Sequence, residues 1–252
     1  MLAFVIPLKS AAVSSSWDQV TSLVRRTLRS ACAQTCPEFR VIVVCHEVPE
    51  VGFGDHRLEF LPVGFPPPGP SKEERRRDRG RKMLAGLWRA LSYRPTHVML
   101  LDADDCVSNH LAGHVAEHPD ANGWYIAKGY FYREGMDTVH VERRRFQEWC
   151  GSSHIVRPEF LELPAPSTEE WYLVHSHIVR RMRKRGTPLE PLPFPGAVYL
   201  ISHGENINDY SPILWPTNPV KRWLRQVLYY RPLTPVMRSE FGLDPQAEVT
   251  AR

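Results

Sequence analysis

Runs of four to six apolar residues recur along the first hundred residues of the chain. They lie at residues 2–6, 40–44, 58–63 and 97–101. Uninterrupted runs of this length, partly β-branched, are typical of strands that are covered on both faces of a sheet. These runs therefore predict four buried strands in the first part of the chain.

Two helices are predicted between these strands. Residues 17–33 carry apolar positions at a spacing close to 3.6. The second helix begins at Ser71, whose hydroxyl can cap it while Glu74 returns the hydrogen bond, and Met83, Leu84, Leu87 and Leu91 make its apolar stripe. The alternation of strands and helices predicts an α/β domain with a mainly parallel sheet flanked by helices.

The second half of the chain is less regular. Residues 122–133 alternate like one half-exposed strand, and residues 149–156 resemble another. Residues 168–186 predict a helix that ends near Gly186, and residues 196–209 predict a last strand with an exit loop. We expect a partly antiparallel C-terminal half.

The composition is that of an ordinary soluble globular protein, with 42% hydrophobic and 24% charged residues. The net charge of +4 is modest, and the basic residues alternate with acids instead of interleaving with aromatic residues, which argues against nucleic-acid binding. The five cysteines form no CxxC pair, which argues against a cysteine-based structural zinc site. The N-terminus lacks the basic region of a signal peptide, so a cytoplasmic location is expected.

Three carboxylates follow the fourth strand in the segment "HVMLLDADDCVS". Asp102 and Asp104 are one residue apart, so both can point the same way and chelate a cation. Hard oxygen ligands suit Mg²⁺ or Mn²⁺, which would take phosphate oxygens as further ligands. The alternative is a turn in which Asp105 or Ser108 caps a helix that begins near Asn109.

This segment, preceded by "GRKMLAGLWRAL", resembles the DxD segment of the GT-A glycosyltransferases, in particular their family 2-like group. "FVIPLKS" resembles the first strand of the same family, and the likeness covers about residues 2–209. The resemblance implies a GT-A fold in residues 1–210, a nucleotide-diphosphate sugar as donor, and Mn²⁺ or Mg²⁺ as cofactor.

The resemblance also implies roles for single residues. Asp104 would be the direct metal ligand, and Asp102 would contact the metal's waters or the ribose of the donor. Pro7 and Leu8 would line the nucleotide. Glu47 is the nearest match to the family's base-reading acid, although Cys45 and His46 before it are unusual.

The segment "KEERRRDRGRK" holds seven basic and three acidic residues. One interpretation is a solvated helix face with ion pairs four residues apart, such as Asp78 with Lys82. A helical wheel instead places Arg77, Gly80 and Arg81 near the extension of the apolar stripe and points Lys82 elsewhere. The family position implies that Arg81 or Lys82 contacts the donor.

Later residues complete the implied site. His203 follows the last strand, where many GT-A enzymes have a metal-binding histidine, and Asn206 could touch the diphosphate. An inverting transfer needs a base, and Glu169 and Glu170 match the family's acidic pair loosely. The alternatives are a hydrogen-bonded core histidine and ordinary acids in the first turn of a helix.

Residues 211–252 are expected to form a C-terminal tail with an amphipathic helix. Residues 218–232 set apolar positions against Lys221, Arg222 and Arg225. Such a helix either packs on the domain or lies on an anionic membrane surface near a lipid-linked acceptor.

Three classes of function remain open. The main hypothesis is a metal-dependent, inverting glycosyltransferase that acts on a saccharide or lipid-linked acceptor. A nucleotidyltransferase of related α/β build normally has a glycine-rich loop after the first strand, but "PLKSAAVSSSW" has no glycine. The third class is an interaction module that binds nucleotide sugars without transferring them.

Overall fold

The computed structural model describes residues 1–252 except 167, 169–170, 172–174, 203–217 and 244–252. Its larger sheet has seven strands in the order β10-β6-β9-β4-β1-β2-β3. In chain order these are β1 (Leu2–Pro7), β2 (Phe39–Cys45), β3 (Leu58–Pro62), β4 (His97–Leu100), β6 (Gly123–Tyr125), β9 (His154–Val156) and β10 (Glu190–Pro191).

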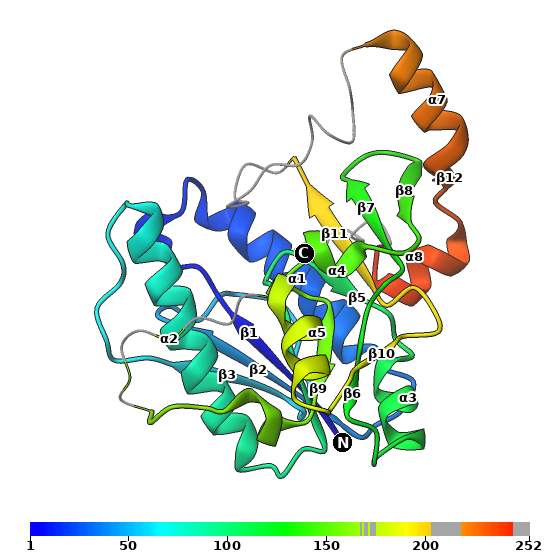
Figure 1. Ribbon diagram of the computed structural model, residues 1–252. Coiled ribbons are helices and arrows are strands. Elements are labelled where there is room, and N and C mark those ends of the chain that lie inside the picture. Colours follow the sequence, from blue (N-terminus) through cyan, green and yellow to red (C-terminus); the bar gives the residue numbers. More distant parts are fainter. Residues whose placement is uncertain (167, 169–170, 172–174, 203–217, 244–252) are drawn as a thin grey trace.

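The four strands predicted from the apolar runs lie side by side and are parallel. Side chains alternate between the two faces of β1, as its extended backbone requires. Leu2, Phe4 and Ile6 join a core with α1 (Trp17–Cys32) and α3 (Leu111–Glu117). Ala3 and Val5 join a second core with α2 (Lys72–Leu91) and α5 (His175–Lys184). Helices therefore cover both faces of the sheet (Figure 1).

Helix α2 begins as the sequence predicts, with Ser71 and Glu74 forming a reciprocal capping box. It lies very close to the sheet. A Cβ atom on Gly86 would come within 2.4 Å of Val5 Cγ1 and 2.7 Å of Val44 Cγ2. Glycine is therefore required where this helix crosses β1 and β2.

A second sheet, which the sequence pattern does not reveal, has five strands in the order β12-β8-β7-β11-β5. They are β5 (Cys106–Val107), β7 (Gly129–Arg133), β8 (Thr138–Glu142), β11 (Ala197–Ile201) and β12 (Tyr230–Pro232). The prediction of one strand over 122–133 is wrong, because the chain passes from β6 in the first sheet to β7 in the second. Both strands have one covered face, so the alternation of apolar and polar residues continues from β6 into β7. The pattern therefore does not reveal where the chain passes from one sheet to the other.

Two other predicted elements are shorter in the structure. Of residues 149–156 only β9 is a strand, because the chain first forms α4 (Phe146–Trp149) and then a turn in which Ser153 Oγ donates to the Cys150 carbonyl at 2.6 Å. Helix α5 begins at His175, and Thr168 lies outside it in a turn closed by its amide and the Ala165 carbonyl at 3.0 Å. Short 3₁₀ turns also occur after β1, at η1 (Ala11–Val13), and after β9, at η2 (Pro158–Leu161).

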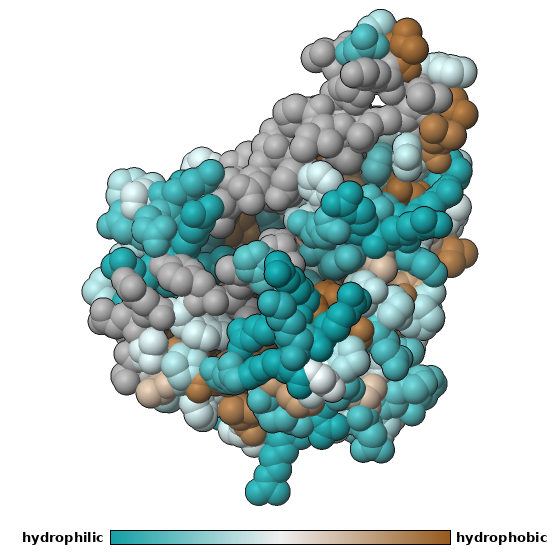
Figure 2. All heavy atoms as spheres, in the orientation of Figure 1, coloured by the Kyte–Doolittle hydropathy of each residue, from teal (hydrophilic) through white to brown (hydrophobic). Residues whose placement is uncertain are grey.

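Residues 230–243, which the sequence groups with the tail, add β12 and α8 (Pro235–Phe241) to the second sheet. Leu233, Phe241 and Leu243 are buried there. Helix α7 (Pro219–Tyr229) instead extends from the body (Figure 1) and exposes apolar residues, visible in Figure 2. The exposed residues include Val220, Trp223, Val227, Leu228 and Tyr229. No described helix is long and apolar enough to cross a membrane.

Candidate functional site

The three acids after β4 lie at the carboxyl edge of the first sheet, as predicted. Leu101 still donates its amide to the Val5 carbonyl at 2.9 Å, so the chain stays beside β1 for one residue past the end of β4 before it turns. The Asp105 amide then donates to the Asp102 carbonyl at 3.2 Å. In α/β sheets ligands bind outside this edge of the strands. The carboxylates are therefore placed where a ligand is expected.

Arg79 of α2 compensates the charge of Asp102. Its Nε lies 3.1 Å from Asp102 Oδ1, and Nη2 contacts the same oxygen. The side chains of Arg79 and Asp102 are 31% and 25% exposed, so water reaches both. Sequence reasoning missed Arg79, although it lies four residues before Met83 and so extends the apolar stripe by one turn.

The turn after α4 supports this cluster from the other side. Ser152 Oγ accepts from the Asp102 amide at 2.8 Å and donates to Asp105 Oδ2 at 2.6 Å. A Cβ atom on Gly151 would come within 2.6 Å of Asp102 Oδ2, so glycine is needed for this close approach. These contacts give the "CGSSH" turn at residues 150–154 a role in supporting the acids.

Asp105 is fully buried and does not cap α3, which begins at Leu111 after His110. Burial raises the pKa of its carboxyl group well above the usual value, and the charges of Asp104 and Asp102 raise the pKa further. Cys150 Sγ also donates to Asp105 Oδ2, at 3.3 Å. Burial and the neighbouring charges favour the neutral form of Asp105, while the partly exposed Asp102 and Asp104 remain at the surface of the cluster.

Tyr199 of β11, in the second sheet, lies near the acid cluster. It is 8% exposed, and burial, followed by the charges of Asp105 and Asp104, raises the pKa of its hydroxyl group. The hydroxyl group therefore stays protonated beside the acids. Sequence reasoning missed Tyr199, because nothing local links β11 to a loop more than ninety residues earlier.

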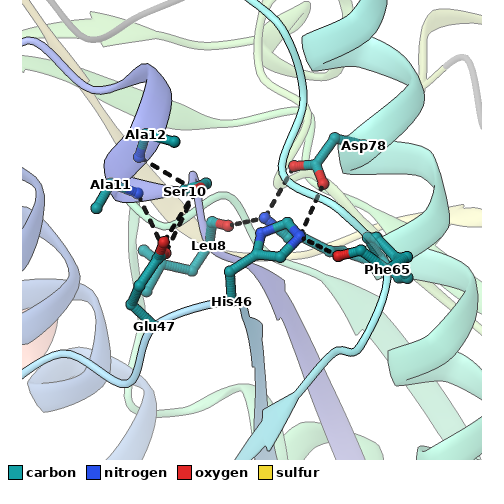
Figure 3. A network of polar contacts seen from close by, with 9 residues as sticks. Leu8, Ser10, Ala11, Ala12, His46, Glu47, Phe65 and Asp78 are labelled. Carbon is teal, nitrogen blue, oxygen red and sulfur yellow. Dashed lines mark hydrogen bonds and ion pairs between the residues drawn. The ribbon is translucent and has the colours of Figure 1, made fainter.

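A second polar network lies next to the carboxyl ends of β1 and β2 (Figure 3). Lys82 Nζ is 2.7 Å from the Leu8 carbonyl and 2.8 Å from Asp78 Oδ2. His46 Nε2 donates to the Phe65 carbonyl at 3.0 Å and lies 3.8 Å from Asp78 Oδ1. The network joins β1, the loops after β2 and β3, and α2.

The helical wheel was wrong about Lys82, and the Asp78–Lys82 pair is not on a solvated face. Lys82 is fully buried and Asp78 is 8% exposed. Burial, the largest cause, lowers the pKa of Lys82, although Asp78 opposes the shift. Arg81 instead places its guanidinium carbon 4.0 Å above the centre of the Phe65 ring. Which of Lys82 and Arg81 contacts a donor stays a prediction.

Glu47 holds the turn after β1. Its carboxylate accepts from Ser10 Oγ at 3.2 Å and from the Ala11 amide at 3.2 Å (Figure 3). Pro7 and Leu8 are buried, so their side chains lie beneath this turn. The base-reading role of Glu47 and the nucleotide contacts of Pro7 and Leu8 stay predictions.

Four predicted residues lie outside the described part of the chain: Glu169, Glu170, His203 and Asn206. The described donor set still fits a hard divalent cation. Asp102 and Asp104 offer carboxylate oxygens, and Arg79 contacts only one oxygen of Asp102. Asp105 is fully buried and is not part of that set.

No protein-family model and no curated protein matches the chain. Among solved structures it is similar to residues 1–349 of TarS from S. aureus, with 13% identity and a TM-score of 0.50 over 79% of this chain and 60% of that chain. The mannosyltransferase PcManGT from Pyrobaculum calidifontis, in complex with GDP-Man and Mn²⁺, gives 14% identity and a TM-score of 0.48 over 81% and 58% of the two chains. A nucleotidyl transferase from Methanothermobacter thermautotroptrophicus gives 16% and 0.43 over 85% and 94%.

The predicted fold class is confirmed. The chain has an α/β fold with mixed sheets flanked by helices, and TarS shares this fold. It spans 60% and 58% of the lengths of the first two structures. Because a shared fold hosts many reactions, the activity has to be argued from the site.

Proposed function

We propose that the protein is a metal-dependent glycosyltransferase. It moves a sugar from a nucleotide-diphosphate donor to a saccharide or lipid-linked acceptor, with inversion at the anomeric carbon. One observation carries the proposal: Asp102 and Asp104 lie at the carboxyl edge of β4, beside the end of β1, with the Arg79 guanidinium between α2 and the cluster. The confirmed fold class supports it.

In this proposal the residues at the carboxyl edge of the first sheet have separate roles. Asp104 and Asp102, with His203, hold Mn²⁺ or Mg²⁺, which when bound neutralises the departing diphosphate. Arg79 partly compensates the charge of the Asp102 carboxylate, and Ser152 holds the backbone amide of Asp102. The turn that Glu47 anchors, together with Arg81 on Phe65, frames the nucleotide, and Asn206 contacts the diphosphate.

The transfer itself needs one proton acceptor. The acceptor's hydroxyl oxygen forms a bond to the anomeric carbon while the bond from that carbon to the phosphate oxygen breaks. Glu170 or Glu169 takes the hydroxyl proton. The nucleoside diphosphate leaves with the electron pair of the broken bond.

The exposed helix α7 supports a lipid-linked acceptor. Val220 and Trp223 are 71% and 64% exposed, and the helix sequence also contains Lys221, Arg222 and Arg225. An apolar face with basic neighbours suits an anionic bilayer surface. In this proposal α7 brings the site to the membrane at which the acceptor resides.

The test compares Asp104→Asn with Asp137→Asn, because the Asp137 side chain is 98% exposed and lies in the β7–β8 turn. Thermal shifts with UDP-, GDP- and dTDP-sugars, with and without Mn²⁺, identify the donor, since a ligand that binds the folded state raises its stability. Mass spectrometry of the products then identifies the reaction. We expect Asp104→Asn to lose the Mn²⁺-dependent shift and the transfer, and Asp137→Asn to retain both.

Two outcomes contradict the proposal. If Asp104→Asn binds Mn²⁺ and the donor like the wild type, the acids do not hold the metal. If the products are pyrophosphate and a nucleotide sugar made from a nucleoside triphosphate and a sugar phosphate, the reaction is nucleotidyl transfer.

A further inference from the structure

A second group of ligating side chains lies at the end of α3. Among the residues that the structure describes, His114, Glu117 and His118 each bring one ligand atom within 4.8 Å of the other two. The histidines are four residues apart and therefore share one face of the helix. His114 is half-buried, whereas Glu117 and His118 are exposed.

The ring of His118 is oriented for ligation. Its Nδ1 lies 2.9 Å from the carbonyl oxygen of His114. A carbonyl oxygen only accepts, so in the neutral ring Nδ1 carries the proton and Nε2 carries the free lone pair. Metal-bound histidines are commonly held in this way, by a hydrogen bond from the other ring nitrogen.

His114 has an unsatisfied ring nitrogen. Its Nε2 is buried and has no hydrogen-bond partner among the described residues, which is costly for a polar atom. The ring packs against Trp124 and Phe194, with centroid distances of 4.8 and 5.5 Å. Burial, followed by the charge of His118, lowers the pKa of His114.

These side chains line an open hollow of about 460 Å³, together with Trp124 and Glu190. Glu190 belongs to β10, the edge strand of the first sheet, and its charge acts on His114. The hollow is separate from the acid cluster. His97 begins β4 and lies 5.0 Å from the Trp124 ring, whereas Asp102 follows the other end of the same strand.

We propose that His114, Glu117 and His118 bind a divalent cation of the zinc class at this end of the molecule. Two imidazoles and one carboxylate suit Zn²⁺, whereas Mg²⁺ and Mn²⁺ prefer sites made of oxygen ligands. Three protein ligands leave a fourth position, which water or Glu190 fills. Since β10 pairs with β6 through only two residue pairs, an ion shared with Glu190 ties this edge strand to α3.

The experiment titrates the full-length chain with Zn²⁺ by calorimetry in excess Mg²⁺, which keeps hard-oxygen sites filled. His118→Ala and Glu117→Gln change exposed side chains, so both variants should fold without metal. We expect His118→Ala to weaken Zn²⁺ binding by about 100-fold and Glu117→Gln by at least about tenfold. His56→Ala, whose side chain is 82% exposed, is the matched control and should bind Zn²⁺ like the wild type.

Two further measurements make the result specific. Co²⁺ in place of Zn²⁺ should give the visible absorption of a four-coordinate site, absent in His118→Ala. Zn²⁺ should raise the melting temperature of the wild type, and Glu190→Gln should reduce that rise if the ion reaches β10. Equal Zn²⁺ affinity in the wild type and His118→Ala, or no saturable binding by the wild type, overturns the proposal. Neither outcome depends on glycosyl transfer.

Discussion

The acid cluster after β4 and the polar network around Lys82 lie at the same edge of the first sheet, yet their side chains differ in exposure. Arg79 and Asp102 are 31% and 25% exposed, whereas the Lys82 and Asp78 side chains are 1% and 9% exposed. A charge pair that water reaches contributes little to folding and can exchange its partner for a ligand. A buried pair has no such freedom, because either charge alone would be stranded. Exposure thus separates the group suited to ligand binding from the group that supports the fold.

The largest expected effect follows from removing the buried cation. Lys82→Ala leaves Asp78 buried without its partner and removes the donor to the Leu8 carbonyl. We expect it to lower the free energy of unfolding by about 3–5 kcal/mol, measured by urea denaturation. The double variant Lys82→Met with Asp78→Leu should recover most of that loss, because it strands no charge.

Lys72→Ala provides the control for this comparison. Lys72 is an exposed residue in the first turn of the same helix, and its replacement should change the stability by about 0.5 kcal/mol or less. A loss below about 1 kcal/mol for Lys82→Ala would mean that the buried pair does not support the fold in the way proposed.

Ser152→Ala should have an intermediate effect, because Ser152 joins both kinds of environment. Its hydroxyl group bonds the partly exposed Asp102 through the backbone amide and the buried Asp105 through the carboxyl group. We expect a loss of about 1–3 kcal/mol in the free energy of unfolding, the cost of leaving a buried polar group without a partner. Ser239→Ala, at an exposed position of α8, should leave the stability unchanged. Equal stabilities of the two variants would contradict this role.

Local patterns in the sequence predicted the parts of the fold that local interactions build. The apolar runs predicted β1 to β4, and the Ser71–Glu74 spacing predicted the start of α2. The second sheet was not predictable in this way. β5 and β12 are two and three residues long, and β12 pairs with β8, about ninety residues away. Strands this short carry no periodicity of their own.

The candidate site also contains residues that the local sequence predicts and residues that it does not. Asp102 and Asp104 were predicted because they directly follow an apolar run. Their partners Ser152 and Tyr199 come from distant elements, and only the folded chain brings them together. The wheel failed for Lys82 because α2 approaches the sheet through Gly86, which buries the row of Asp78, Lys82 and Gly86, four residues apart.

The smallest expected effect on stability concerns Arg79. Because the pair with Asp102 is partly exposed, Arg79→Gln should lower the free energy of unfolding by no more than about 1 kcal/mol. It should also change cation binding in the direction opposite to a lost ligand. Removing the guanidinium leaves the adjacent charges of Asp102 and Asp104 less compensated, so Mn²⁺ alone should bind about two- to fivefold more tightly, the equivalent of up to about 1 kcal/mol.

The measurement is a calorimetric Mn²⁺ titration in a His118→Ala background, so that the cluster on α3 does not contribute. Arg76→Gln is the control, because Arg76 is an exposed residue of the same helix and should leave the Mn²⁺ affinity unchanged. Weaker Mn²⁺ binding by Arg79→Gln would show that Arg79 positions Asp102 for the cation instead of competing with it. In that case the Arg79–Asp102 pair would have a structural role at the site, as the Lys82–Asp78 pair has in the fold. Exposure alone would then not distinguish a ligand-binding group from a structural one.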